Sequence, residues 1–169
     1  MVTVRVPSSP WFPNNGRCIE YDIEPRHGLY GHPLNGETWA ILEPLIRENH
    51  TAAGIDAALR LDFRKLEACN PRVWILWHEG QAVGYCAHIV APHLFTGELT
   101  ATCAAIYVRP DHRAKVRRMI ADIELDLCED GVAGINYSVP HLSKAGAFFE
   151  HVGYGCTELV MSKRLEPSQ

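Results

Sequence analysis

The chain begins with an alternation of apolar and polar residues. Residues 2–6, VTVRV, follow the period-two pattern of a half-buried strand. From Pro7 to Pro33, prolines and glycines recur too often for a long helix or strand. The pattern predicts an N-terminal strand and an irregular arm over residues 1–34, followed by one domain over residues 35–169.

Two helical segments are expected at the start of that domain. Residues 36–50 have a helical pattern with Pro44 inside it, which predicts a kink or two short helices. Thr51 is placed to cap a second helix. The apolar stripe of that second helix would consist of Ile55, Leu59, Phe63 and Leu66.

Strand patterns follow. The stretch VWILWHEGQAVGYCAHIV consists of two apolar runs around the dipeptide Glu79-Gly80, which predicts a β-hairpin. The loop APHLFTGE then leads to a third predicted strand from Leu99 to Val108.

The next helix has the clearest pattern in the chain. One apolar face is formed by Val116, Ile120, Ile123 and Leu127, with Met119 beside it. The opposite face, with Asp122, Asp126 and Glu129, is expected to meet water, and Gly131 is expected to end the helix. The segments VAGINYSV, residues 143–152 and CTELVMSKRL then predict a strand, a short helix and a closing strand. This order is that of a mixed α/β or α+β domain.

Composition narrows the class of protein. The 169 residues are 47% hydrophobic and 21% charged, with a formal net charge of -4. A sequence pI of about 6.1 argues against a general nucleic-acid binder, which is normally basic. The 6 cysteines contain no Cys-x-x-Cys pair, and no apolar run has the length of a membrane span. A cytoplasmic chain with reduced thiols is expected, without membrane contact.

Four stretches in this order resemble the GNAT superfamily of acetyl-CoA-dependent N-acetyltransferases. LDFRKLEA is similar to the second helix of a bacterial and phage branch, and HEGQAVGYCAHIVAPHL to the strand hairpin. AIYVRPDHR is similar to the strand before the coenzyme loop, and AFFEHVGYGCTELVMSKRL to the last helix and strand. The resemblance implies an α+β (mixed α/β) GNAT fold. Its central, mostly antiparallel, twisted sheet has helices on both faces and strands that splay apart at the coenzyme site.

The resemblance also implies a coenzyme site and a reaction. Backbone groups of the strand that ends in Ile106, Tyr107 and Val108 would bind the pantetheine arm of acetyl-CoA. The loop after it would bind the pyrophosphate, and an amine of a small molecule or a protein would accept the acetyl group. The residues implied for the loop are Arg113, Ala114, Lys115, Val116, Arg117 and Arg118.

The loop departs from the family pattern. Val116 and Arg118 stand where the family places glycine or another small residue, which lets backbone approach phosphate closely. Four cations are nevertheless expected in the first turns of a helix, where each costs about 0.3–1 kcal/mol unless an anion is nearby. Coenzyme phosphates would satisfy them, as would a protein partner at the basic patch from Arg109 to Arg118. A solvated charged face is the alternative that needs no ligand.

The catalytic pattern also departs from the family. Phe149 replaces a tyrosine that protonates the departing thiolate, and it cannot donate a proton, although its place still implies contact with the coenzyme. Cys103 and Ala104 occupy the positions of the usual strand acid, and Leu142 that of an asparagine. Two functions therefore stay open: an active N-acetyltransferase, or a catalytically degenerate protein that binds and regulates or inhibits another protein. A nucleic-acid-associated module is a distant third.

Other side chains are candidates to supply the missing groups. His93 and Glu98 lie in the loop before the third strand, near where the substrate groove would open, while Tyr137 and His141 lie at the end of the next strand, on the opposite wall. A histidine has a reference pKa of about 6.5, which suits a general base at neutral pH. Cys86-x-His88, together with His93, has no second ligand pair at fixed spacing, so no metal site is expected.

Overall fold

The computed structural model describes residues 2–3, 20–21, 31–53, 62–139 and 144–155. The chain divides into two units, Met1–Tyr137 and Ser138–Gln169, which are described separately. The first unit contains a five-stranded sheet in the order β3-β4-β5-β6-β7. These strands are β3 (His32–Pro33), β4 (Arg72–His78), β5 (Gln81–Pro92), β6 (Leu99–Val108) and β7 (Gly134–Asn136).

The pairing within this sheet is mostly antiparallel, as the family resemblance implies. Only the β6-β7 pair is parallel. β3 pairs with β4, and Leu34 is buried, so the residues just before position 35 join the sheet. The boundary between an arm and a domain at residues 34 and 35 stays a prediction. Two short strands, β1 (Val2–Thr3) and β2 (Glu20–Tyr21), pair separately.

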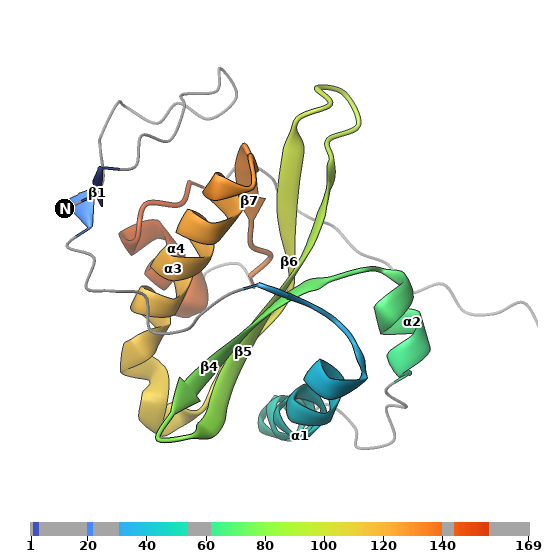
Figure 1. Cartoon of the computed structure of the whole chain (residues 1–169). Coiled ribbons are helices and arrows are strands. Elements are labelled where there is room, and N and C mark those ends of the chain that lie inside the picture. The colour runs from blue at the N-terminus through green and yellow to red at the C-terminus, as the bar shows by residue number, and fades with distance from the viewer. Residues whose placement is uncertain (1, 4–19, 22–30, 54–61, 140–143, 156–169) are drawn as a thin grey trace, which may run out of the picture. The chain divides into compact units, whose positions relative to one another are not determined.

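Two helices pack on opposite faces of the sheet. Figure 1 shows α1 (Gly36–Ala52) on one face and α3 (Val116–Glu129) on the other. Each helix covers its own apolar cluster. The cluster on the α1 face contains Leu34, Leu42, Leu45, Val73, Ile75, Tyr85 and Tyr107. The cluster on the α3 face contains Trp74, Cys86, Ala101, Val108, Met119, Ile123 and Leu127.

The first helix differs from its prediction. α1 is one continuous helix through Pro44, because Leu42 and Leu45 on either side of the proline are buried against the sheet. Asn35 caps its first turn by accepting from the Thr38 amide at 2.9 Å. Thr51 lies in the last turn of α1, so its predicted role as the cap of a second helix is wrong.

The second helix is shorter than predicted. α2 (Phe63–Ala68) begins after Asp62, whose carboxylate accepts from two amides of its first turn. This places Phe63 and Leu66 in a helix, as expected. The other two residues of the predicted stripe, Ile55 and Leu59, lie outside the described residues.

The predicted hairpin and third strand are confirmed. The two-residue turn at Glu79 and Gly80 has φ angles of 49° and 76°. Positive φ at both positions is the signature of a type I′ turn, whose twist matches that of the paired strands. β6 has the predicted bounds.

The long helix has the predicted apolar face, but two of the three acidic residues expected to meet water do not, because the Asp122 side chain is only 16% exposed and accepts from Arg118. Met119, Ile120, Ile123 and Leu127 are buried, and Gly131 follows the helix with a φ of 79°. Asp126 does not face water, because its side chain is only 12% exposed and lies 3.2 Å from Arg72 in an ion pair. Its carboxylate accepts from the Trp74 indole N–H at 2.8 Å and from a backbone amide, that of Gly31, at 3.0 Å. It thereby ties α3 to the edge of the sheet.

The second unit contains α4 (Lys144–His151), which agrees with the predicted short helix. Phe149 packs edge-on against Phe148 and Tyr154, with ring centroids 5.5 and 5.4 Å apart. The predicted closing strand lies outside the described residues. Within the described residues, no helix is both long and apolar enough to cross a bilayer.

Candidate functional site

β6 has two neighbouring strands over only part of its length. β5 pairs with it from Leu99 to Val108, whereas β7 pairs only with Thr100, Ala101 and Thr102. Among the described residues, no strand pairs with the other edge of residues 103–108, which we call the open edge. Its backbone amides and carbonyls on that side are the groups that a strand would otherwise use.

A β-bulge coincides with the start of the open edge. Ala87 pairs with Ala105 and His88 with Cys103, so Ala104 has no partner on β5. An extra residue bends its strand and increases the local twist. The bend follows directly after Thr102, the last residue paired with β7. β6 and β7 therefore separate where the bulge redirects β6.

A glycine keeps the opposite edge of β6 close to β5. A Cβ added at Gly84 would lie 2.8 Å from the Tyr107 carbonyl oxygen and 2.8 Å from a methyl of Val108. Real Cβ atoms do not approach backbone this closely, so any side chain here would displace the end of β6. The glycine of the VGY stretch therefore helps to position the open edge.

The side chain of Tyr107 points away from the α3 face and joins a polar group that sequence reasoning missed. Its hydroxyl donates to the Glu48 carboxylate of α1 at 2.7 Å, and Arg109 Nε donates to the same carboxylate at 2.9 Å. Burial, followed by the neighbouring carboxylate, raises the pKa of Tyr107 to about 12. Glu48 lies in a predicted helix far from Tyr107 in sequence, and no local motif links the two. At the open edge, backbone groups are therefore available to a ligand, whereas the Tyr107 hydroxyl is already bonded to Glu48.

The predicted phosphate loop is a 3-10 turn, η1 (Pro110–Lys115), that runs directly into α3. Arg113 and Lys115 lie in this turn, so the prediction that all four cations lie in the first turns of the helix is wrong for these two. Arg117 and Arg118 do lie in the first turn of α3, which has no acidic residue and no side-chain cap.

Two of the four cations have protein partners. Lys115 Nζ lies 3.0 Å from His78 Nδ1, and Arg118 Nε donates to Asp122 at 2.9 Å. Arg113 and Arg117 are exposed, and within the described residues neither has an ion pair. These two arginines are the ones left to meet an anion.

Val116 replaces a small residue for a structural reason. Its side chain packs against the apolar cluster of the α3 face, and its amide donates to the Arg113 carbonyl. This amide is therefore engaged in the turn. A phosphate here would depend more on guanidinium groups than on backbone amides.

The predicted catalytic residues occupy separate places. His93 and Glu98 are exposed at the tip between β5 and β6, where the His93 amide donates to the Glu98 carbonyl at 2.7 Å. Cys103 is five positions along the chain from Glu98, about 16 Å at 3.3 Å per residue. The structure brings His93 and Glu98 together, and it places both away from the open edge.

Tyr137 lies closer to the start of the open edge. It follows β7 directly and packs edge-on against His88, with ring centroids 5.3 Å apart. His141 lies outside the described residues. Phe149 belongs to the second unit, so its predicted contact with the coenzyme stays a prediction.

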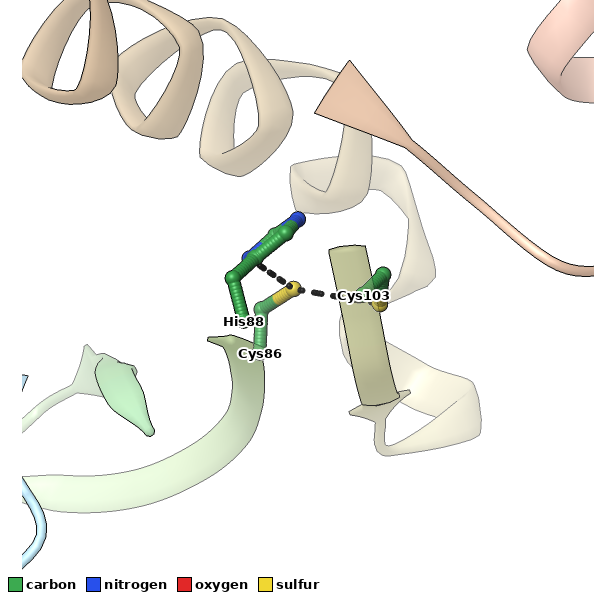
Figure 2. Close-up of side chains that lie close together, drawn as sticks. All are labelled: Cys86, His88 and Cys103. Atoms are coloured by element: carbon green, nitrogen blue, oxygen red, sulfur yellow. Dashed lines mark hydrogen bonds between the residues drawn. The ribbon is translucent and has the colours of Figure 1, made fainter. Parts of the chain in front are cut away.

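A cluster of soft donors is buried beneath α3, and we call it the Cys-His cluster: Cys86, His88 and Cys103. Figure 2 shows the Cys86 sulfur between the His88 ring and Cys103. Cys86 Sγ lies 3.6 Å from His88 Nδ1 and 3.9 Å from Cys103 Sγ. Cys86 and His88 point to the same side of β5, and Cys103 opposes His88 across the hairpin. Side-chain alternation along β5 and the register of the hairpin together predict that these three side chains meet. A search for fixed spacings between metal ligands does not detect this arrangement.

Burial changes the protonation of the cluster. Burial lowers the pKa of His88 to about 4, so the imidazole is neutral at physiological pH. Burial, followed by the Cys103 thiol, raises the pKa of Cys86 well above its ordinary value. As an isolated thiol, Cys86 is therefore a poor nucleophile.

Comparison with known proteins supports the fold. No family model and no curated protein matches the sequence. An aminoglycoside acetyltransferase from an uncultured soil metagenomic sample superposes with a TM-score of 0.68 at 15% identity, covering 83% of this chain and 97% of its own. A ribosomal-protein-alanine N-acetyltransferase from Brucella melitensis biovar Abortus 2308 gives 0.62 at 18% identity, with 80% and 99% covered.

A Trypanosoma brucei acetyltransferase gives a TM-score of 0.61 at 17% identity, covering 81% of this chain and 99% of its own. All three solved structures are acetyltransferases, and each covers 80% or more of this chain. Sequence identities this low establish shared architecture. The mixed sheet, its separated strands and these superpositions together show that the chain has the fold of the GNAT acetyltransferases.

Proposed function

We propose that this protein is an acetyl-CoA-dependent N-acetyltransferase, which transfers an acetyl group to an amine of a small molecule or a protein. The observation that carries the proposal is the open edge of β6, which begins where the bulge separates β6 from β7. An edge of this kind can bind an extended, amide-bearing chain by main-chain hydrogen bonds, as an added strand would. The pantetheine arm of acetyl-CoA is such a chain.

The coenzyme residues are assigned on this basis. Backbone groups of Ile106, Tyr107 and Val108 would hold the arm, and the exposed Arg113 and Arg117 would hold the phosphates. Guanidinium groups form strong, forked hydrogen bonds with phosphate, which offsets the missing glycines. The remaining residues assigned to the coenzyme loop are Ala114, Lys115, Val116 and Arg118. The residues present therefore fit the coenzyme, with a larger share of the binding carried by side chains.

Proton transfer is assigned by position. Of the three predicted catalytic residues, Tyr137 is next to the start of the open edge, and its phenol is a proton donor at neutral pH. His93 and Glu98 are assigned to the side on which the acceptor amine enters. Their exposure at a hairpin tip suits contact with an acceptor better than contact with a buried thioester.

A catalytically degenerate binding protein is the second candidate. Val116 is packed into the core, and Lys115 and Arg118 already have protein partners. Each of these contacts removes a group that a coenzyme loop would use. In this reading, the patch from Arg109 to Arg118 binds an acidic surface of a protein that the chain regulates or inhibits.

The decisive experiment is calorimetric titration of the full chain with acetyl-CoA, together with the variants Arg113→Ala and Arg117→Ala. Arg64→Ala, which removes an exposed arginine of α2, is the matched control. Each loop variant should weaken binding by more than tenfold, about 1.4 kcal/mol, because it removes a charge-assisted bond to phosphate. The control should bind as the parent does.

Release of coenzyme thiol in the presence of mixed amines then separates the two candidates. Binding with turnover supports the transferase, whereas binding without turnover for any amine class supports the degenerate protein. Absence of any heat at millimolar acetyl-CoA would refute the coenzyme site itself.

A further inference from the structure

We propose that the Cys-His cluster binds a single zinc ion through Cys86 Sγ, Cys103 Sγ and His88 Nδ1. The three ligand atoms come from two paired strands and lie within 4.8 Å of one another. The cluster belongs to the α3 face of the sheet, and the proposal does not depend on acetyl transfer.

The distances between the donor atoms match those around a tetrahedral zinc ion. Zinc binds sulfur at about 2.3 Å and imidazole nitrogen at about 2.0–2.1 Å. Tetrahedral angles then place two sulfurs about 3.8 Å apart, and a sulfur and a nitrogen about 3.6 Å apart. The corresponding distances are 3.9 Å for the two sulfurs and 3.6 Å for Cys86 Sγ and His88 Nδ1. Only the distance between Cys103 Sγ and His88 Nδ1 would have to shorten when zinc binds.

The donors also suit the charge of the ion. Two thiolates and one neutral imidazole neutralise a divalent cation, so the loaded site carries no net charge into the apolar core. This matters because an uncompensated buried charge is strongly destabilising. Thiolate and imidazole are the donors that zinc prefers, whereas calcium and magnesium prefer oxygen.

Not every polar atom of the Cys-His cluster has a hydrogen-bond partner within the described residues. His88 is fully buried, and its Nε2 has no hydrogen-bond partner among the described residues. Its ring packs edge-on against Trp74 and Tyr137, which orient it without satisfying its polar atoms. The polar contact of His88 Nδ1 is with a thiol, a weak partner, so core packing explains this buried imidazole poorly. A metal bond to Nδ1 would replace this weak sulfur contact with a strong interaction and place the proton of the neutral ring on Nε2.

The ion would join β5 to β6 at the bulge. Cys103 is half-buried and is the first residue of the open edge, so its thiol is the accessible member of the cluster. Cys86 and His88 come from β5, and Cys103 comes from the paired strand β6. Zinc would therefore hold β5 and β6 together at the point where β6 separates from β7. The main expected effect of zinc is to raise the free energy of unfolding.

Cobalt(II) titration of the reduced, chelator-treated full chain tests the site, because cobalt in a thiolate site gives charge-transfer and tetrahedral d-d absorption. We expect saturation at one cobalt per chain, displacement by zinc, and a higher melting temperature with zinc. Cys103→Ser and His88→Gln should each weaken binding by more than about 100-fold, since even outer-shell changes cost 10–100-fold. Cys69→Ser, at an exposed thiol outside the cluster, is the matched control and should bind as the parent does.

Several results would overturn the proposal. These are cobalt spectra without thiolate charge transfer, a spectrum unchanged by Cys103→Ser, or equal loss in the Cys69→Ser control. Circular dichroism shows whether each variant is folded, and the half-buried Cys103 is the position where serine is best tolerated. If the parent instead loses two hydrogens by mass in air and then binds no metal after full reduction, the cluster is a disulfide pair and the zinc site is refuted.

Discussion

On the α1 face of the sheet, buried polar side chains reach partners near the rim. Tyr107 donates to Glu48, which also accepts from Arg109, and the Tyr85 hydroxyl accepts from Asn49 at 3.3 Å. On the α3 face, His88 and two thiols lie among apolar side chains, and within the described residues His88 Nε2 has no partner. The two faces belong to the same three central strands, and the α3 face differs in that Asp126 is satisfied whereas, within the described residues, His88 Nε2 is not.

Polar groups that have partners within the protein are explained by structure alone, whereas a polar group without a partner is a candidate for binding a ligand. The Glu48, Tyr107 and Arg109 contacts join α1 to the end of β6, and each group has a partner of opposite or complementary character. Such a network needs no ligand. The Cys-His cluster has soft donors and a position at the bulge, and within the described residues it has no ion pair, so it is the group that a ligand would complete.

The largest effect is expected from Asp126, the polar group that closes the α3 face. Asp126→Ala removes the acceptor for the Trp74 indole and the Gly31 amide and leaves Arg72 without one partner. Breaking a buried pair typically costs about 3–5 kcal/mol. Glu129→Ala, at an exposed position of the same helix, should cost below about 1 kcal/mol. Denaturant unfolding of both variants measures this difference, and equal losses would contradict the assigned role.

Acid should destabilise the apo protein through His88. Unfolded histidine takes up its proton near 6.5, whereas folded His88 does so at about 4. Between these pH values the unfolded chain binds more protons, so stability falls as the pH falls. The integrated loss from His88 is about 3 kcal/mol at 1.36 kcal/mol per unit.

The measurement compares apo parent protein with His88→Gln by melting in chelator from pH 7 to pH 4. The variant should lose less stability over this range than the parent does. Parallel pH profiles for the two proteins would show that His88 titrates normally and is not buried as described.

Gly84→Ala should cost about 1–3 kcal/mol, because its new methyl would meet the Tyr107 carbonyl and a Val108 methyl at 2.8 Å. Gly36→Ala is the matched control, since a Cβ there has no atom within 4 Å and lies in the first turn of a helix. Chemical unfolding should show a loss for Gly84→Ala alone. If Gly84→Ala also weakens acetyl-CoA binding, the end of β6 is part of the coenzyme site.

The smallest effect is expected on the α1 face. Tyr107→Phe removes one hydrogen bond to Glu48, which keeps its bond to Arg109, and the cost should be about 1–2 kcal/mol. The raised pKa of Tyr107, about 12, gives a second readout in alkali. Its stabilisation is complete below pH 10 and disappears as the pH rises through 12, so the parent and variant melting curves should converge there. A constant gap between the curves would show that the hydroxyl is not bonded to Glu48.

Much of the fold could be predicted because its elements have strong local patterns. The Glu79-Gly80 hairpin, the bounds of β6 and the buried face of α3 all follow from periodicity and turn chemistry. The predictions for Pro44 and Thr51 were wrong because tertiary packing outweighs local preference: burial of Leu42 and Leu45 holds α1 together through the proline. Asp126 was misplaced for a related reason, since its partners lie on β4 and just before β3.

What the sequence alone determined about this protein is its order of elements, its apolar faces, its GNAT resemblance and the departures at Val116, Arg118 and Phe149. These depend on residues close together in the chain. Only the tertiary structure decided that Glu48 meets Tyr107, that Arg113 and Arg117 are the unpaired cations of the described loop, and that two cysteines and a histidine converge. Strand register and the bulge at Ala104 set those contacts, and a shift of one residue would turn each side chain to the other face of the sheet.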